Sequence, residues 1–334
     1  MRSQLDAHTS ENDPVRKVLL INGQSQQVAD TFNALAPDGL ETAWLPANLS
    51  DAEKIDHLCD VEFLVLHPAS VSGVVLREAK SLRLLQLLAA GHEKVDLKTA
   101  MELGIPVATN GGANAWAVAE HAIALMLALY KRLIPCDKSV RAGEWRKAAN
   151  GFNTFELAGK TVGVIGAGNI GRKVARRAKA FETNIIYFDT FAVPEIENEL
   201  RARKVSLDEL VSTADVITLH APLLKETQGL IGQREFAAMK PGAILINTSR
   251  AELVDEAALI EALRTKKIGG AGIDVYYQEP VRIDHPLLTM DNVVLTPHTA
   301  GHAFEGWARR CRFARENIQR VTRGEHPTFV AKLD

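Results

Sequence analysis

The chain has few cysteines, and their positions suggest no cross-links or metal ligands. Cys59, Cys136 and Cys311 are the only three in 334 residues, and they are far apart in the sequence. This spacing fits neither a disulfide framework nor a metal site. We therefore expect ordinary thiols of a reducing cytoplasm and no bound metal.

A surplus of charge is also lacking, and so is a long hydrophobic run. The formal net charge of -2 gives no basic field for nucleic acid and no attraction to an anionic membrane surface. The longest apolar stretch, residues 122–130, is too short to cross a bilayer. Residues 1–14 contain no apolar segment of an export signal, which predicts a disordered tail on a cytoplasmic protein.

The hydrophobic content of 46% allows a large core, and a chain of this length is expected to form two domains. Short apolar runs alternate with segments of helical spacing, which is typical of α/β proteins with parallel sheets. A long helix is expected over residues 113–132. Before it, the expected strands are residues 17–21, 62–66, 84–88 and 107–108.

After the long helix, six further strands are expected, the number in a full doubly wound sheet. They end at Ile165 and Asp189 or span residues 216–219, 243–247, 272–275 and 293–296. A last helix over residues 304–323 is expected to return to the first domain. The predicted fold class is α/β, with two Rossmann-like or flavodoxin-like parallel-sheet domains and a cleft between them. Their expected bounds are 15–112 plus 303–334, and 113–302.

A glycine-rich loop, Gly-Ala-Gly-Asn-Ile-Gly, joins an apolar strand to a helix in the second domain. Gly166 permits a tight turn, Gly168 lets the backbone approach a pyrophosphate, and Gly171 lets the helix pack against the strand. Asn169 and Ile170 open the helix, whose unpaired N–H groups and positive dipole end favour phosphates. A structural glycine turn would show the same pattern, but the position between strand and helix favours a dinucleotide site.

The next apolar strand ends in Asp189, whose carboxylate is expected to bind the ribose hydroxyls of the adenosine. A 2'-phosphate would meet like charge there, and residues 190–193 supply no compensating cation. We therefore expect NAD as the cofactor in preference to NADP. The alternative interpretation is that Asp189 only ends a strand as a turn residue.

Three polar side chains follow strands of the second domain, at the edge where open parallel sheets bind ligands. They are Arg250, Glu279 and His298. A guanidinium matches a carboxylate in shape and polarises a carbonyl, and histidine is suited to protonating an alkoxide near neutral pH. A carboxylate against the other ring nitrogen fixes the tautomer. Each residue alone also fits a surface ion pair or a turn, but together they predict hydride transfer to a keto acid.

Several motifs in order, from about Lys17 onward, resemble the D-isomer-specific 2-hydroxyacid dehydrogenase family, in particular glyoxylate and hydroxypyruvate reductases. The matching segments are AGHEKVD at 90–96, GANAWAVAEH at 112–121, the glycine-rich loop, NTSRAELVD at 247–255, AGIDV at 271–275 with Glu279-Pro280, and TPHTAG at 296–301. The resemblance implies that Arg250 binds the substrate carboxylate and carbonyl, that His298 is the acid and base, and that Glu279 is its partner.

The resemblance also implies the remaining contacts. Asp274 is expected to hold the nicotinamide carboxamide, and the N–H groups of Ala90 and Gly91 to receive the substrate carboxylate. Pro222 and Thr248 are further expected cofactor contacts. The family's long helix and the arm that follows it imply a homodimer.

The predicted function is an NAD-dependent oxidoreductase that interconverts a small 2-keto acid, such as glyoxylate or hydroxypyruvate, and the D-2-hydroxy acid. The alternative is a nucleotide-sensing, corepressor-like binding protein with little turnover. Trp116 and Trp307 either line the substrate pocket or serve in helix packing or a dimer contact, and His92 has no assigned role. His121 is expected to pack or to form a hydrogen bond, and His220 either contacts the adenine edge or ends a strand.

Overall fold

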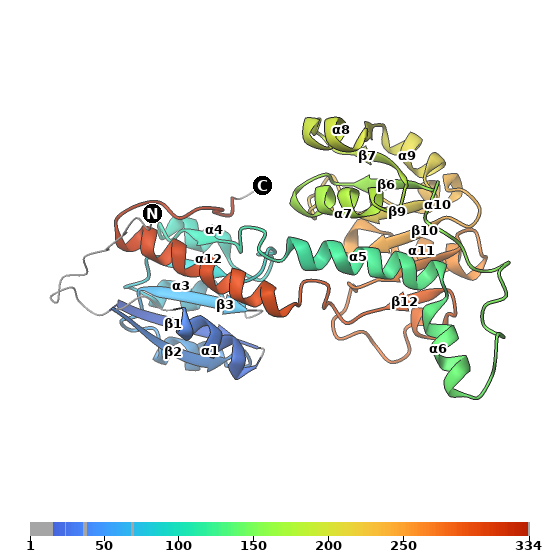
Figure 1. Ribbon diagram of the computed structural model, residues 1–334. Coiled ribbons are helices and arrows are strands. Elements are labelled where there is room, and N and C mark those ends of the chain that lie inside the picture. The colour runs from blue at the N-terminus through green and yellow to red at the C-terminus, as the bar shows by residue number, and fades with distance from the viewer. Residues whose placement is uncertain (1–15, 24, 36–38, 68–69, 333–334) are drawn as a thin grey trace, which may run out of the picture. The chain divides into compact units, whose positions relative to one another are not determined.

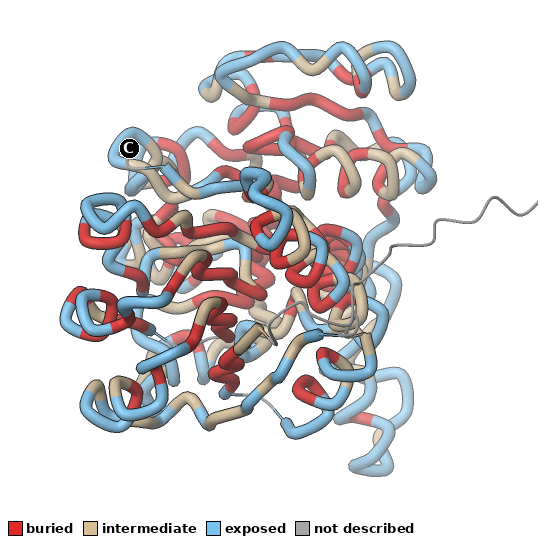
Figure 2. Tube along the Cα trace, turned by 90° about the vertical axis from the view of Figure 1, so that its left-hand side faces the viewer, coloured by how far each residue is buried: buried red, intermediate tan, exposed pale blue. Residues whose placement is uncertain are grey.

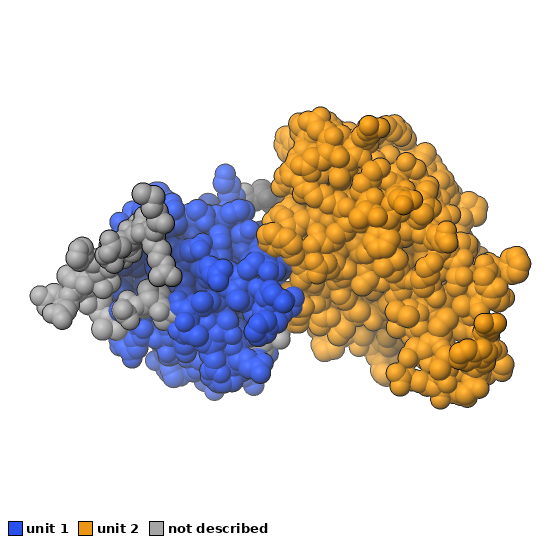
Figure 3. Space-filling model, in the orientation of Figure 1, with its two compact units in different colours: residues 1–114, 303–334 blue, residues 115–302 orange. Residues whose placement is uncertain are grey.

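The computed structural model describes residues 16–23, 25–35, 39–67 and 70–332. The expected tail at residues 1–14 lies outside these ranges. The chain divides into two compact units (Figure 3): unit 1 comprises Met1–Asn114 and Ala303–Asp334, and unit 2 comprises Ala115–His302. The chain therefore completes unit 2 before it returns to unit 1 with its last helix.

Unit 1 contains a five-stranded sheet in the order β2-β1-β3-β4-β5, the order of flavodoxin-like folds, and every neighbouring pair is parallel. The central strand β3 reads Phe-Leu-Val-Leu-His and is buried at every residue, as expected for a strand covered on both faces. The strands are β1 (Arg16–Asn22), β2 (Leu40–Pro46), β3 (Phe63–His67), β4 (Leu84–Leu87) and β5 (Val107–Ala108). The edge strand β2 is an addition to the four that the sequence predicted.

Helices cover both faces of the sheet in unit 1. The helices are α1 (Gln26–Ala34), α2 (Asp51–Asp56), α3 (Gly73–Glu78), α4 (Leu97–Glu102) and α12 (Phe304–Thr322). The last helix packs beside the first: Cys311, Ala314 and Ile318 of α12 share one core cluster with Val28 and Phe32 of α1 (Figure 1). This shared core explains why the C-terminal helix belongs to unit 1.

Unit 2 contains a seven-stranded parallel sheet in the order β12-β11-β10-β9-β6-β7-β8. This is the doubly wound order of dinucleotide-binding folds, with the reversal between β6 and β9. The strands are β6 (Thr161–Ile165), β7 (Asn184–Phe188), β8 (Arg203–Lys204), β9 (Val216–Leu219), β10 (Ile244–Asn247), β11 (Gly270–Ile273) and β12 (Val293–Leu295). The six expected strands are confirmed. The expected number of strands was too low by one, because the short edge strand β8 was not predicted.

Two buried layers lie on opposite faces of this sheet. One layer contains Val174 of α7 and Met126 of α5, and the other contains Leu210, Phe236 and Leu259 of later helices. The strands β9, β10 and β11 are buried at every residue, and Figure 2 shows such buried segments in the interior of the trace. The helices are α5 (Ala115–Tyr130), α6 (Leu133–Arg141), α7 (Asn169–Lys179), α8 (Pro194–Leu200), α9 (Leu207–Thr213), α10 (Gln233–Ala238), α11 (Glu256–Arg264) and the 3-10 turns η1 (Ala251–Leu253) and η2 (Pro286–Thr289).

In the described part of the chain, no helix combines the length and the apolar character that a membrane span requires. Within the same residues, no three His, Cys, Asp or Glu side chains are grouped so that they could hold a metal ion.

Candidate active site

The three expected catalytic residues follow three adjacent strands. Asn247, the last residue of β10, is paired in register with Ile273 of β11, and Ile273 is paired with Leu295 of β12. The parallel strands therefore end at one edge of the sheet. Arg250, Glu279 and His298 all come from the loops that leave that edge.

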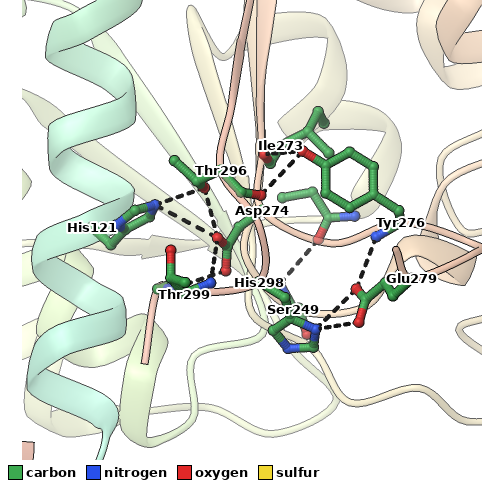
Figure 4. A network of polar contacts seen from close by, with 11 residues as sticks. His121, Ser249, Ile273, Asp274, Tyr276, Glu279, Thr296, His298 and Thr299 are labelled. Carbon is green, nitrogen blue, oxygen red and sulfur yellow. Dashed lines mark hydrogen bonds and ion pairs between the residues drawn. The ribbon is translucent and has the colours of Figure 1, made fainter. Parts of the chain in front are cut away.

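His298 and Glu279 are in direct contact. His298 Nδ1 lies 2.9 Å from Oε1 and 2.8 Å from Oε2 of Glu279, and both side chains are partly exposed (Figure 4). A carboxylate only accepts hydrogen bonds, so the contact assigns a proton to Nδ1. The second ring nitrogen, Nε2, is then the one available for exchange of a proton with another molecule.

Tyrosines tie the loop that carries Glu279 to the segments that follow the two neighbouring strands, β12 and β10. The backbone N–H of Tyr276 donates to Glu279 Oε1 at 3.2 Å, and the Tyr276 hydroxyl lies 3.1 Å from the carbonyl oxygen of Thr296. The Tyr277 hydroxyl donates to the carbonyl of Val254 at 2.8 Å. Burial, reinforced by the charges of nearby carboxylates, raises the pKa of Tyr276 to about 12, so its hydroxyl stays a neutral donor. No role of these tyrosines was predicted from the sequence.

Arg250 follows a turn that is held by hydrogen bonds of the Asn247 side chain. The side-chain oxygen of Asn247 accepts the N–H of Ser249 at 3.0 Å, and its amide nitrogen donates to the Arg250 carbonyl at 2.8 Å. The Ser249 hydroxyl donates to the carbonyl of Ala221 at 2.6 Å, which joins this turn to the loop after β9. The position of Arg250 is therefore set by the turn, and its Nη1 donates to the Ser249 carbonyl at 2.8 Å.

Asp274 lies at the end of β11 and is almost completely buried. Its Oδ1 accepts hydrogen bonds from the Thr296 hydroxyl at 2.6 Å and the Thr299 N–H at 2.9 Å, and its Oδ2 accepts the Ala300 N–H at 2.9 Å. These donors lie on both sides of His298 in the chain. Asp274, predicted as a nicotinamide contact, thus also holds the turn that presents the histidine.

The glycine-rich loop has the geometry expected of its three glycines. Gly166 has φ +87°, and a Cβ on it would lie 2.4 Å from the Ala221 nitrogen. A Cβ on Gly171 would lie 2.0 Å from the Gly166 carbonyl oxygen. A Cβ on Gly168, by contrast, would meet nothing within 4 Å. The fold itself thus explains the first and third glycines but leaves open space at the second, directly before α7.

Asp189 turns toward the glycine-rich loop. Its Oδ2 accepts the N–H of Ala167 at 2.7 Å, and its Oδ1 accepts the N–H of Phe191 at 3.2 Å. A cation that was not predicted from the sequence lies close by, because Lys204 on β8 donates to the carbonyl of Thr190 at 3.1 Å. Residues 190–193 contain no cation, as expected, but the neighbouring strand supplies one.

The basic surface of α7 is largely paired with acids. Arg172 Nη1 lies 2.5 Å from Glu195 Oε2, and Arg176 contacts both Glu195 and Glu199. Lys173 stacks over the ring of Trp116, with Nζ 4.2 Å from the ring centroid. Trp116 therefore contacts a neighbouring helix, which matches the packing alternative for this residue.

Two polar residues with buried side-chain atoms follow the adjacent strands β10 and β9. The hydroxyl of Thr248, after β10, is buried and has no hydrogen-bond partner among the described residues. The His220 ring, after β9, contacts the Thr218 hydroxyl through Nε2 at 2.8 Å, and burial lowers its pKa to about 3. His220 is therefore a neutral ring in the folded protein. Pro222 follows on the same loop, and its carbonyl accepts the Thr227 hydroxyl at 2.7 Å.

The two expected contacts to the substrate carboxylate lie in unit 1. Ala90 and Gly91 follow β4, and within the described ranges neither backbone N–H donates a hydrogen bond. Trp307 also belongs to this unit: its ring meets His67 edge-on with centroids 4.7 Å apart, and the Arg310 guanidinium lies 4.6 Å from its centroid. For Trp307, too, the observed contacts are packing contacts.

Known proteins resemble this chain over most of its length. A sequence model described as "D-isomer specific 2-hydroxyacid dehydrogenase, NAD binding domain" matches residues 123–300. A glyoxylate reductase from Korarchaeum cryptofilum is 38% identical over 276 residues, which is 82% of this chain and 83% of that protein. A D-3-phosphoglycerate dehydrogenase from Archaeoglobus fulgidus is 38% identical over 309 residues, 92% of this chain but only 58% of that protein.

The fold of this chain is also similar to that of solved structures. The apo-structure of D-lactate dehydrogenase from Escherichia coli superposes with a TM-score of 0.84 at 31% identity, covering 94% of this chain and 100% of that one. The prediction of two parallel-sheet α/β domains and of NAD as the cofactor is thereby confirmed. The chain belongs to the D-isomer-specific 2-hydroxyacid dehydrogenase family.

Proposed function

We propose that the chain interconverts a small 2-keto acid and the D-2-hydroxy acid, with His298 as acid and base. The contact of His298 Nδ1 with both oxygens of Glu279, at 2.9 and 2.8 Å, is the observation that supports this most. With Nδ1 held by a carboxylate, Nε2 delivers a proton to the substrate oxygen during reduction and removes it during oxidation. Glu279 stabilises the imidazolium that forms in the oxidation direction.

Arg250 is proposed to bind the substrate carboxylate and to polarise its carbonyl. The planar guanidinium matches a carboxylate with two parallel hydrogen bonds, which also orients the carbonyl carbon. The backbone N–H groups of Ala90 and Gly91, which have no acceptor among the described residues, are proposed to receive the same carboxylate. Unit 1 would then be the substrate-binding domain and unit 2 the nucleotide-binding domain.

The residues around the glycine-rich loop suit NAD, which supplies the hydride when it is bound. The open space at Gly168 leaves room for a pyrophosphate against the first N–H groups of α7, at Asn169 and Ile170. The buried, unpartnered hydroxyl of Thr248 is a polar group that a ligand can satisfy. We propose that Asp189 binds the adenosine ribose.

Two further contacts complete the proposed cofactor site. Asp274 is proposed to hold the nicotinamide carboxamide, and Pro222 to line the same site. Both residues follow strands of unit 2, Asp274 after β11 and Pro222 after β9. They therefore lie at the edge of the sheet where a doubly wound fold binds its nucleotide.

The substrates that we propose are glyoxylate, hydroxypyruvate or a longer analogue. The similar proteins bear the names glyoxylate reductase, D-3-phosphoglycerate dehydrogenase and D-lactate dehydrogenase, and all three names refer to small 2-keto or 2-hydroxy acids. We also propose that the protein works in the cytoplasm.

The proposed function is tested with a panel of 2-keto acids, each assayed with NADH and in parallel with NADPH. We expect at least one acid to cause oxidation of NADH, followed by its absorbance. If NADH binds but no acid is reduced, the proposed function is wrong, and the nucleotide-sensing alternative takes its place.

A further inference from the structure

The side chain of His121 reaches from α5 to the network that holds the catalytic turn, residues 296–300. His121 Nε2 lies 2.9 Å from Thr296 Oγ1 and 3.8 Å from Asp274 Oδ1. Thr296 Oγ1 in turn lies 2.6 Å from Asp274 Oδ1. Figure 4 shows the three side chains pointing toward one another from the helix and from the ends of two strands.

The number of available protons fixes the direction of these hydrogen bonds. Asp274 accepts backbone N–H groups on both oxygens, which is the pattern of an ionised carboxylate. It therefore also accepts the single proton of the Thr296 hydroxyl. Thr296 Oγ1 has then no proton left for His121, so the ring must donate to it from a protonated Nε2. The chain of donors runs from His121 to Thr296 to Asp274.

The helix behind His121 is a rigid support. On α5, Ala119, Ala122 and Met126 are fully buried in the core of unit 2. A Cβ on Gly272 of β11 would lie 2.9 Å from Leu125 Cβ, so the helix packs closely against the strand that Asp274 follows. His121 is thus held at a fixed distance from the carboxyl end of that strand.

We propose that His121 is a positioning residue for the reaction, a role that rests on the proposed function of His298 and Asp274. By donating to Thr296, His121 keeps the hydroxyl directed at Asp274 Oδ1. Asp274 can then bind the Thr299 and Ala300 N–H groups, which fix the turn that presents His298. Without His121 the Thr296 hydroxyl is free to rotate, and the carboxylate and the turn lose a defined geometry.

Kinetics of four variants test the proposal, using the keto acid that the wild-type protein reduces best. His121→Leu removes the donor, and Thr296→Val removes the hydroxyl. In each we expect kcat to fall about tenfold, the usual weight of one hydrogen bond near a charged group. The KM for the keto acid should not change, because Arg250 is untouched. His121→Gln, which keeps an N–H donor at a similar reach, and Thr296→Ser, which keeps the hydroxyl, should restore most of kcat.

Because both residues act through one contact, the double variant His121→Leu/Thr296→Val should be no slower than either single variant. His57→Leu, at an exposed histidine of unit 1, is the matched control and should leave kcat unchanged. The proposal would be overturned if the kcat losses of the two single variants multiply in the double variant. It would also be overturned if the variants are less stable but keep full kcat per folded molecule.

A measurement without substrate separates this proposal from the proposed function. Nitrogen-15 spectra of the histidine rings, with His121 assigned by its loss in His121→Gln, should show Nε2 of His121 protonated. A ring protonated only at Nδ1 would contradict the inferred chain of donors, even if the enzyme is active. If no keto acid is reduced but Nε2 of His121 is protonated, the inferred chain of donors is correct. The proposed role of His121 in catalysis is then wrong together with the proposed function.

Discussion

At the scale of single residues, His298 has a backbone conformation that its neighbours must hold. Its φ of 54° lies in the left-handed region, which costs a residue other than glycine roughly 1–3 kcal/mol. Its N–H donates to the Thr296 carbonyl at 3.1 Å, and the next two N–H groups are bound by Asp274. The direction of the ring is therefore set by the buried carboxylate and by Glu279.

Several contacts around the candidate site could not be predicted from the sequence. Arg250, Glu279 and His298 follow apolar strands, so their place at the sheet edge was predictable. Tyr276, His121 and Lys204 act through contacts with other elements. Such contacts depend on the packing of a helix or of an edge strand, which no spacing in the sequence reveals.

The charge of Asp189 is expected to set the preference for NADH over NADPH. Asp189→Asn keeps an acceptor for the Ala167 N–H but removes the charge that a 2'-phosphate would meet. With Lys204 close by, we expect the ratio of kcat/KM for NADH to that for NADPH to fall roughly tenfold to a hundredfold. Steady-state kinetics with both cofactors measure it, and an unchanged ratio would remove Asp189 from the selection.

His220 is expected to make the stability of unit 2 depend on pH. Burial lowers its pKa to about 3 in the folded state, below the value of about 6.5 in an unfolded chain. Below pH 6.5 only the unfolded state takes up the proton, so stability is full above that pH and is lost as the pH falls toward 3. At pH 5 the loss is about 2 kcal/mol.

Urea unfolding of the wild type and of His220→Gln at pH 7 and pH 5 isolates this effect from the carboxylates, which titrate in both proteins. We expect the free energy of unfolding of the wild type to drop more between the two pH values than that of the variant. Equal drops would mean that the His220 ring takes up its proton without unfolding.

At the scale of elements, the strand, loop and helix at Gly166–Gly171 form the part of the site that follows most directly from the sequence. The buried strand β6 ends at Ile165, and α7 begins at Asn169. The three glycines at 166, 168 and 171 satisfy two different demands: close contact with neighbouring backbone, and open space for a ligand. Two alanine variants separate these demands.

Gly171→Ala should destabilise the fold, because its Cβ would lie 2.0 Å from a backbone oxygen, and we expect a loss of about 1–3 kcal/mol in the free energy of unfolding. Gly168→Ala is the matched control for the fold, since its Cβ meets nothing. It should keep the stability but weaken NADH binding, as the methyl group would occupy the space proposed for the pyrophosphate. Thermal unfolding and titration with NADH measure both effects. Unchanged NADH affinity in Gly168→Ala would place the pyrophosphate elsewhere.

The two strands that were not predicted from the sequence, β2 and β8, were missed for the same physical reason. β2 reads Leu-Glu-Thr-Ala-Trp-Leu-Pro and lies at the sheet edge, where none of its residues is fully buried. β8 consists of Arg203 and Lys204, both exposed. Edge strands of this kind lack the continuous apolar run by which buried parallel strands are recognised, so hydrophobic pattern alone does not detect them.

At the scale of the whole molecule, several exposed apolar side chains of unit 2 lie on one segment, α6 and the residues that follow it. Leu133 and Val140 of α6 are 58% and 57% exposed, and Trp145 and Phe152 in the segment that follows are 76% and 94% exposed. Apolar groups concentrated in this way are typical of a surface that another chain covers. We propose that this segment forms the interface of a homodimer.

Analytical ultracentrifugation should show a mass of two chains for the wild type at micromolar concentration. The double variant Leu133→Glu/Val140→Glu places charges on the proposed interface and should sediment as one chain. Ile283→Glu, at a residue that is 95% exposed but outside this segment, is the control and should remain a dimer. A single-chain mass for the wild type would contradict the homodimer.

In the proposed function, His298 transfers the proton in the reduction of a 2-keto acid. The most direct test compares the turnover of wild type and His298→Ala with NADH and the best keto acid of the panel. We expect the variant to lose about 100-fold to 10,000-fold in turnover, the usual effect of removing a positioned general acid, while it still binds NADH. Turnover close to that of the wild type would contradict the account.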